Sequence, residues 1–369
     1  MKNETVILPW DLAESFVTDV FEAIGVPRDE AAICADVLLE SDRRGIESHG
    51  LNRFKPIYYD RVREGVQKAT TEFEVVKKTM TTAVVDGHDG MGQVIGKKSM
   101  QMAIDMAKAY GMGMVSVRNS THYGIAGYYA TMATKAGLVG IVGTNARPSQ
   151  APTFGTENMM GTNPLTFGFP TDEDFPFLLD CATSIIQRGK IEYYARLGTP
   201  VPEGLVINAD GEPMTDAEAI LDALTAGQAA LAPVGGSLPE TGGYKGYGYA
   251  AAVEIMSAAF SAGSFLKALS GKKDGVNVPH RLGHFFIVID PEGFVGLDSF
   301  RKTTGDILRS LRASRKAKGQ ERIYTAGEKE YYISLDRAGS GVPVTPDVQK
   351  ELLDIRAELG LSGYRFPFE

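Results

Sequence analysis

Apolar and polar positions follow two successive patterns along the 369-residue chain. The first 65 residues have the spacing of helices, most clearly over residues 29–44, where Ile33, Val37 and Leu38 share one face and acidic residues lie near the start. From residue 73 onward, short apolar runs typical of strands alternate with helical segments and glycine-rich turns. This alternation predicts an α/β organisation for the middle of the chain.

The strands expected in this middle region cover residues 81–85, 113–117, 140–143, 175–180 and 284–290. The helices expected between them cover residues 96–110, 125–136 and 249–261. The stretch 198–243 is rich in Pro, Gly and Asp, and we expect it to form loops.

Helical spacing returns after the last expected strand, first over residues 299–318 and then in a final helix. Thr345 suits the N-cap of that helix, Pro346 its first position and Gly360 its end. Helical material at both ends predicts a discontinuous, mainly helical domain of residues 1–70 plus 295–369. The α/β domain would then cover residues 71–294.

Composition and charge narrow the functional classes. The 38 Lys and Arg residues against 46 Asp and Glu give a net charge of −8, which argues against a nucleic-acid partner. Cys34 and Cys181 belong to no CxxC pair, and the chain has no spacing typical of a metal site. The first residues lack the apolar run of a signal peptide, and no stretch is apolar enough to cross a membrane. These features predict a cytoplasmic protein without a membrane or metal partner.

Residues 45–53 contain the first candidate for chemistry. His49 and Arg53 are four residues apart, so they share one face if Ser48 caps a helix there. An Arg suits a carboxylate and a neighbouring His suits proton exchange, as the reaction of a keto acid requires. The alternative is a surface His beside a solvated Arg.

A second candidate is His122, in a polar loop directly after an expected strand and beside Gly124 and Gly127. Active sites of α/β proteins commonly use such loops. The alternative is a histidine that only bonds the backbone of its own loop.

Several stretches of small and polar residues suit a nucleotide, although each is also compatible with ordinary turns. They cover residues 144–147, 161–165 and 180–184, with Lys190 close behind. Glycines over 242–248, with Lys245 and a helix to follow, suit an anion; a flexible connector is the alternative. Residues 90–96 spell GxGxxxG rather than GxGxxG and are not assigned to a cofactor.

Taken together, these stretches resemble the malate/L-lactate dehydrogenase family of the non-Rossmann type. The resemblance rests on motifs in the same order along nearly the whole chain, at residues 44–50 with Arg53, 120–124, 161–165, 180–184, 189–192, 243–248, 284–292 and 326–330. It implies an α/β fold with a mixed-sheet nucleotide-binding domain and a discontinuous helical domain formed by the two termini. Arg147 departs from the family pattern, since relatives more often have a small or acidic residue there.

The resemblance also implies the chemistry: an NAD- or NADP-dependent dehydrogenase, usually a homodimer, acting on small 2-oxo or 2-hydroxy acids. His49 and His122 are both candidates for the proton donor, and Arg53 would hold the substrate carboxylate. The implied cofactor positions are Asn145, Thr162, Asn163, Pro164, Asp180, Cys181, Ala182, Thr183, Ser184, Lys190, Lys245, Gly327 and Glu328.

We expect a protonated imidazole to donate to the carbonyl oxygen as the hydride reaches the carbon. Three alternatives remain: a reductase of cyclic imino acids of the piperideine- or pyrroline-2-carboxylate type, a non-catalytic nucleotide-binding protein, and a metal-dependent hydrolase.

Overall fold

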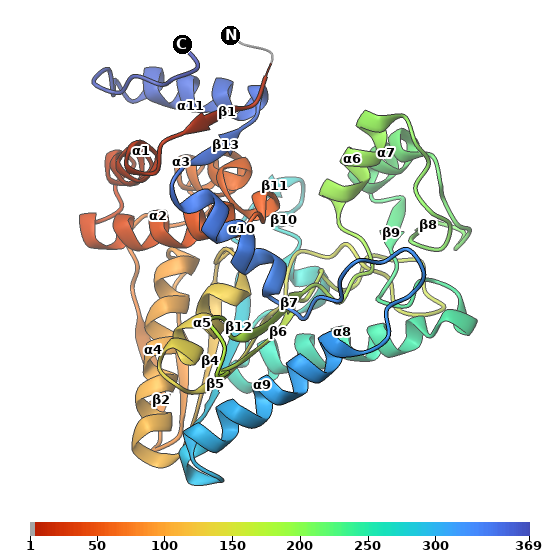
Figure 1. Ribbon diagram of the computed structural model, residues 1–369. Coiled ribbons are helices and arrows are strands. Elements are labelled where there is room, and N and C mark those ends of the chain that lie inside the picture. The colour runs from red at the N-terminus through yellow and green to blue at the C-terminus, as the bar shows by residue number, and fades with distance from the viewer. Residues whose placement is uncertain (1–3) are drawn as a thin grey trace.

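Seven strands form a central mixed sheet in this computed structural model, which describes residues 4–369 (Figure 1). Their order is β2 (Glu74–Lys78), β3 (Thr82–Asp86), β4 (Met112–Ser120), β12 (Leu282–Ile289), β5 (Val139–Thr144), β6 (Leu165–Phe169) and β7 (Phe177–Cys181). Within this sheet only β3 and β4 pair in parallel, joined by helix α4 (Gly92–Tyr110), and the other neighbours are antiparallel. The sheet is therefore not doubly wound, and the expected non-Rossmann mixed sheet is confirmed.

Strand β12 lies at the centre of the sheet although it comes late in the chain. His284 faces Val117 of β4 on one side and Thr144 of β5 on the other. Helices α4 and α5 (Ala126–Lys135) cover one face of the sheet, where they share an apolar core with Phe286. Helix α8 (Gly243–Ala258) covers the opposite face and approaches closely, since a Cβ on Gly283 would lie 2.0 Å from the Ser257 carbonyl oxygen.

Both ends of the chain build a second core, on which helices α1 (Trp10–Ala23), α2 (Arg28–Arg43) and α11 (Pro346–Glu358) converge. Strand β1 (Val6–Leu8) pairs with β13 (Val342–Val344), and both termini lie at this end of the molecule (Figure 1). Helix α9 (Leu297–Ala313) instead contacts the sheet region, where Arg309 pairs with Asp172 at 2.9 Å. The domain boundaries at residues 70 and 295 stay a prediction.

The expectation of loops throughout residues 198–243 is wrong. This stretch contains β8 (Val206–Asn208), α7 (Ala217–Ala226) and β9 (Ala229–Leu231), which share a small apolar core with α6 (Arg188–Leu197). Asp216 caps α7 by accepting a hydrogen bond from the Ala219 amide at 2.8 Å, and Ile220 is fully buried. Prolines and glycines flank this short amphipathic segment, so the composition of the whole stretch indicates loops although the segment itself is helical.

Several helix limits also differ from expectation, most of all at α8, which begins at Gly243 instead of residue 249. Its first turn packs directly on a neighbouring chain segment: a Cβ on Gly243 would lie 1.8 Å from the Gly236 carbonyl oxygen, and one on Gly246 would lie 2.2 Å from that of Val234. These glycines therefore serve close backbone packing, and residues 242–248 are not an open loop. No helix within residues 4–369 has the length and apolar character to span a membrane.

Candidate active site

Two imidazoles that the sequence places far apart lie face to face. The rings of His49 and His122 are stacked, with centroids 5.8 Å apart and planes inclined by 22°. His49 belongs to a 3₁₀ turn, Glu47–His49, that follows α2 in the terminal core, whereas His122 follows β4 of the sheet. The pair therefore joins the two main parts of the molecule.

The turn that carries His49 is held by a buried carboxylate. The expected α-helix capped by Ser48 is wrong, because two 3₁₀ turns and a π-helix (Phe54–Tyr59) occupy this segment. Gly50 packs so closely that a Cβ there would lie 2.1 Å from Asp42 Oδ1, and the Leu51 amide donates to Asp42 Oδ2 at 2.9 Å. The chain therefore has no room for a regular helix at this point.

Arg53 nevertheless lies beside His49. Its Nε donates to the Ser48 carbonyl oxygen at 2.8 Å, and the Ser48 hydroxyl lies 2.9 Å from His49 Nδ1. Within residues 4–369 no carboxylate forms an ion pair with Arg53. An unpaired guanidinium next to an imidazole is suited to binding an anionic group of a ligand.

Burial keeps both imidazoles neutral near pH 7 in the ligand-free protein. Burial and, to a smaller extent, the charge of Arg53 lower the pKa of His49 to about 4. Burial also holds the pKa of His122 well below its usual value. His122 Nδ1 lies 2.6 Å from the Tyr58 hydroxyl and accepts from the Gly124 amide at 3.3 Å, so the proton of the neutral ring belongs on Nε2.

A pocket of about 660 Å³ opens beside His49. It brings together eight of the residues predicted from the sequence: His49, Thr162, Pro164, Asp180, Cys181, Ala182, Ser184 and Lys190. The Ser184 hydroxyl is buried without a hydrogen-bond partner in the described structure. A polar ligand in this pocket would satisfy that hydroxyl, since a buried donor is costly to leave unpaired.

The N-terminus of α6 also reaches this pocket. The helix begins at Arg188, no side chain caps it, and its first turn contains no acidic residue. Gln187, Gly189 and Lys190 line the pocket. Free amides at the positive end of a helix dipole, together with a lysine, suit the phosphates of a dinucleotide.

An adjoining pocket of about 310 Å³ extends this space toward the start of α10 (Glu328–Ala338). Asp180 borders both pockets, and Gly327 lines the second. The Asp180 carboxylate accepts from the Gly127 amide at 2.7 Å and from the Thr166 hydroxyl at 2.8 Å. It therefore fixes the end of β7 against α5, and its freedom to bind a ligand is limited.

Five other predicted cofactor residues line neither pocket: Asn145, Asn163, Thr183, Lys245 and Glu328. Asn145 and Asn163 are fully buried and both donate to Glu254, at 3.4 and 2.7 Å. Thr183 donates to the Thr162 carbonyl oxygen at 3.1 Å. These three residues hold together the loops that shape the pocket.

The other two predicted cofactor residues, Lys245 and Glu328, lie at the starts of helices α8 and α10. Glu328 is fully buried, accepts from the Thr325 amide at 2.9 Å and pairs with Arg312 and Arg322. Lys245 is exposed in the first turn of α8, beside the packed glycines. Direct contact of these five residues with a cofactor stays a prediction.

Comparison with known proteins identifies the scaffold. The sequence pattern of a family described as malate/L-lactate dehydrogenase matches residues 8–353. The chain is 41% identical over 357 residues to a malate dehydrogenase of Pyrococcus horikoshii, covering 96% of both chains. It is 36% identical to an L-sulfolactate dehydrogenase of Methanocaldococcus jannaschii, over 97% of this chain and 98% of that one. A crystal structure of malate dehydrogenase from Entamoeba histolytica superposes with a TM-score of 0.92 at 42% identity, covering 97% and 99% of the two chains.

The chain belongs to the malate/L-lactate dehydrogenase family.

Sequence reasoning missed two residues that shape the site of this dehydrogenase, Asp42 and Tyr58. Asp42 holds the His49 turn and Tyr58 bonds His122, yet both lie in segments that look like ordinary core. The hint in the sequence is the spacing of five residues between Arg53 and Tyr58. This spacing places both side chains on one face when the segment is a π-helix. Such helices are frequent at functional sites.

The glycines at 90–96 and His284, which stand out in the sequence, have structural roles in the dehydrogenase. A Cβ on Gly92 would lie 2.4 Å from the Thr121 carbonyl oxygen, so the 90–96 glycines let α4 approach the His122 loop. His284 is fully buried in the sheet and bonds the Thr144 hydroxyl at 2.7 Å. Within residues 4–369, the His, Asp and Glu cluster with metal-ligand spacing is Glu72, Glu74 and His88, which does not include the stacked pair.

Proposed function

We propose that this protein transfers a hydride between a nicotinamide dinucleotide and a small 2-oxo or 2-hydroxy acid. The stacked pair His49 and His122 exchanges a proton with the substrate oxygen, and Arg53 binds the substrate carboxylate. The observation that carries the proposal is the face-to-face imidazole pair beside an unpaired guanidinium, with His49 of that pair at the wall of a pocket large enough for part of a dinucleotide.

The residues around the pocket fit such a cofactor. Ser184 supplies a buried hydroxyl without a partner, and the open N-terminus of α6 with Lys190 supplies positive charge. Bound there, the nicotinamide would accept or supply the hydride. We propose NAD or NADP without distinction, because both carry the same pyrophosphate and nicotinamide.

Because both imidazoles are neutral, the direction of the reaction determines whether the site must first take up a proton. A neutral ring accepts the hydroxyl proton when a 2-hydroxy acid is oxidised, whereas reduction of a 2-oxo acid needs a protonated ring. Because burial keeps the pKa of His49 at about 4, the reducing direction requires proton uptake. A bound anion beside the ring raises this pKa, so binding of the 2-oxo acid is accompanied by that uptake.

Malate and L-sulfolactate, which name two of the relatives, are candidate substrates. Reduction of a cyclic imino acid on the same scaffold is the alternative, because its ring nitrogen also takes a proton next to a carboxylate. The stacked histidines and Arg53 argue against a protein that only binds the nucleotide.

A substrate panel tests the proposal. Purified protein is incubated with NADH or NADPH and either 2-oxo acids or cyclic imines, and the cofactor absorbance is followed. We expect turnover with at least one 2-oxo acid. Turnover of imines alone supports the alternative, and binding of NAD(P)H without any turnover contradicts the proposed activity.

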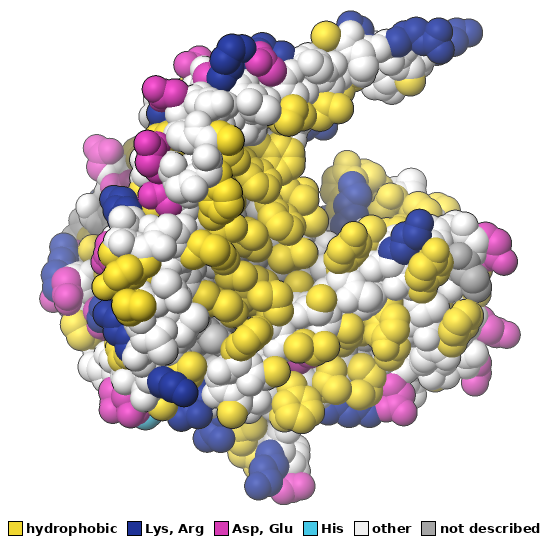
Figure 2. Space-filling view, turned by 90° about the horizontal axis from the view of Figure 1, so that it is seen from below, with side chains coloured by type: hydrophobic (Ala, Val, Ile, Leu, Met, Phe, Trp, Pro, Cys, Tyr) yellow, Lys and Arg dark blue, Asp and Glu magenta, His cyan; other side chains and the backbone are white. Residues whose placement is uncertain are grey.

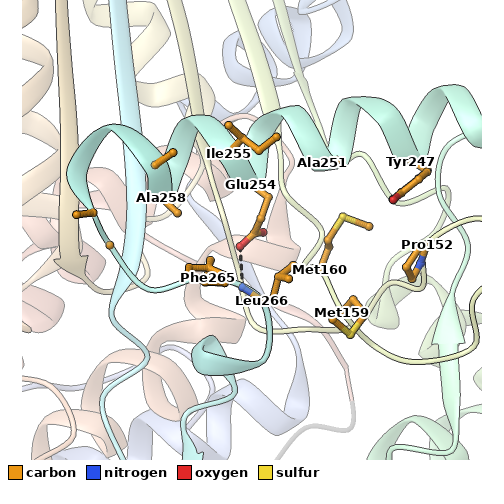
Figure 3. Close-up of a pocket in the computed structure, with 13 residues that line it drawn as sticks. Pro152, Met159, Met160, Tyr247, Ala251, Glu254, Ile255, Ala258, Phe265 and Leu266 are labelled. Carbon is orange, nitrogen blue, oxygen red and sulfur yellow. Dashed lines mark hydrogen bonds between the residues drawn. The ribbon is translucent and has the colours of Figure 1, made fainter.

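We also propose a cytoplasmic homodimer, with the second copy covering the exposed face of α8. Hydrophobic side chains gather over a hollow on this face, with charged residues around its rim (Figure 2). Tyr249, Ile255 and Phe265 are each more than half exposed there. An apolar pocket of about 640 Å³ lies between α8 and a wall formed by Met159, Met160 and Leu266 (Figure 3).

An apolar face of this extent is typical of a protein interface. Light scattering should show a dimer for the wild type and a monomer for Ile255→Asp. A monomeric wild type would contradict the dimer, and a dimeric variant would contradict this interface.

A further inference from the structure

Glu254 carries a buried carboxylate that the proposed mechanism does not use. It lies on α8, is 6% exposed and points toward Leu266 (Figure 3). Oε1 accepts from the Asn145 side chain at 3.4 Å and from the Leu266 backbone amide at 2.9 Å, and Oε2 accepts from the Asn163 side chain at 2.7 Å. A carboxylate is costly to bury, and no ion pair of residues 4–369 includes this one. The three bonds therefore indicate a role beyond packing.

One oxygen of Glu254 holds the loop that forms a wall of the cofactor pocket. Asn163 lies in this loop, and its neighbours Thr162 and Pro164 line the pocket. The backbone φ of Asn163 is 35°, in the left-handed region that few residue types other than Gly, Asn and Asp adopt. The bond to Glu254 therefore helps to keep this loop in a conformation that the backbone alone does not favour.

The second oxygen of this carboxylate leads to the imidazole pair through Asn145. Asn145 Oδ1 accepts from the Gly283 amide at 2.8 Å. The next residue, His284, stacks on the ring of Tyr123 with centroids 4.3 Å apart and planes inclined by 7°. Tyr123 directly follows His122 in the chain, so this series of contacts places the His122 loop.

We propose that Glu254 is a positioning residue, which fixes the cofactor-pocket loop relative to the His122 loop and so sets the distance between the hydride donor and the proton donor. This inference rests on the proposed function. Delivery of a hydride to the substrate carbon and a proton to its oxygen requires both donors in register, and a displacement of about 1 Å costs roughly 100-fold in rate. A carboxylate suits this position because it presents two acceptor oxygens, one toward each loop.

Glu254→Gln tests this role with almost no change in volume. Glutamine has a single acceptor oxygen, which we expect to stay with the two donors Asn145 and Leu266. Its NH₂ group then faces the NH₂ group of Asn163, so that this contact is lost. The variant should lose about 10- to 100-fold in kcat per folded protein, measured with the 2-oxo acid that the wild type reduces fastest.

The affinity for NADH should change less than about threefold in this variant. The pocket wall keeps its other bonds, since the Thr183 hydroxyl still donates to the Thr162 carbonyl oxygen at 3.1 Å. A loss in kcat without a comparable loss in NADH binding separates a positioning role from general damage to the pocket. Urea unfolding gives the folded fraction in the same samples.

The double variant Glu254→Gln/Asn163→Asp exchanges donor and acceptor at the lost contact. The carboxylate introduced at position 163 can accept from the glutamine and from the Ala146 amide, and it tolerates a left-handed backbone. The bond from Asn163 to the Ala250 carbonyl oxygen, 3.2 Å in the wild type, is not restored. We therefore expect kcat to recover at least about fivefold, but not completely.

Glu240→Gln, at an exposed position just before α8, is the matched control. Wild-type kcat in folded Glu254→Gln overturns the positioning role, as does a loss that the double variant does not recover. If the single variant does not fold, the double variant decides: kcat within about tenfold of the wild type supports the role, and a folded but inactive protein overturns it. These outcomes leave the proposed function intact, whereas a wild type that reduces no 2-oxo acid overturns both.

Discussion

The buried carboxylate of Asp42 allows a quantitative test of how the His49 turn is held. Asp42 is 1% exposed, and its pKa is raised from 3.8 to about 8, mainly by burial and in smaller part by the charge of Glu47. The folded protein therefore keeps Asp42 protonated up to about pH 8, whereas the unfolded chain ionises it above 3.8. A raised pKa of this kind means that stability is lost as the pH rises between these two values.

One pKa unit corresponds to about 1.4 kcal/mol, so this group costs the wild type about 3 kcal/mol of stability between about pH 5.5 and about pH 7.5. Asp42→Asn removes the titration but keeps an oxygen that accepts from the Leu51 amide. The free energy of unfolding of the variant, relative to the wild type, should therefore increase by about 3 kcal/mol over that interval.

Urea unfolding followed by the fluorescence of Trp10 measures this difference directly. Trp10 is the single tryptophan, packs against the terminal core and donates to the Arg337 carbonyl oxygen at 2.8 Å. Asp11→Asn is the matched control, because it replaces an exposed carboxylate on α1, the helix that carries Trp10. A difference between Asp42→Asn and the wild type that does not change with pH would refute the reasoning.

Three further predictions concern the site itself. Tyr58→Phe removes the hydroxyl that bonds His122 and should lower kcat about tenfold with little change in KM, whereas Tyr59→Phe should not; equal kinetics in both variants would argue against the hydrogen bond. Gly50→Ala places a Cβ 2.1 Å from a buried carboxylate oxygen and should destabilise the protein by about 1–3 kcal/mol in urea unfolding; an unchanged midpoint would contradict this packing. Cys181 lines the cofactor pocket and Cys34 is buried, so a maleimide should label only Cys181, at least about tenfold more slowly with saturating NADH; undiminished labelling would place the cofactor elsewhere.

Local patterns predicted much of the sheet and part of the site. The strands expected over 113–117 and 284–290 correspond to β4 and β12, and several residues of the stretches 161–165 and 180–184 do line one pocket. Side-chain alternation and loop chemistry are local properties, so a single sequence contains them. The central position of β12 depends instead on pairing between residues far apart in the chain, which local patterns do not specify.

The remaining errors have similar physical causes. Whether glycines at 242–248 cradle an anion or allow close packing depends on what lies opposite them, and here that is the backbone of Val234 and Gly236. The His49 turn and the π-helix are imposed by contacts with Asp42 and His122, because tertiary contacts override local helix propensity.

The central claim is that the stacked imidazoles move the substrate proton, and turnover of His49→Ala and His122→Ala tests it most directly. Cofactor binding is measured in the same samples by NADH fluorescence, which separates loss of chemistry from loss of the binding site. The account predicts that at least one variant loses about 10²–10⁴-fold in kcat while still binding NADH. Turnover close to the wild type in both variants would contradict it.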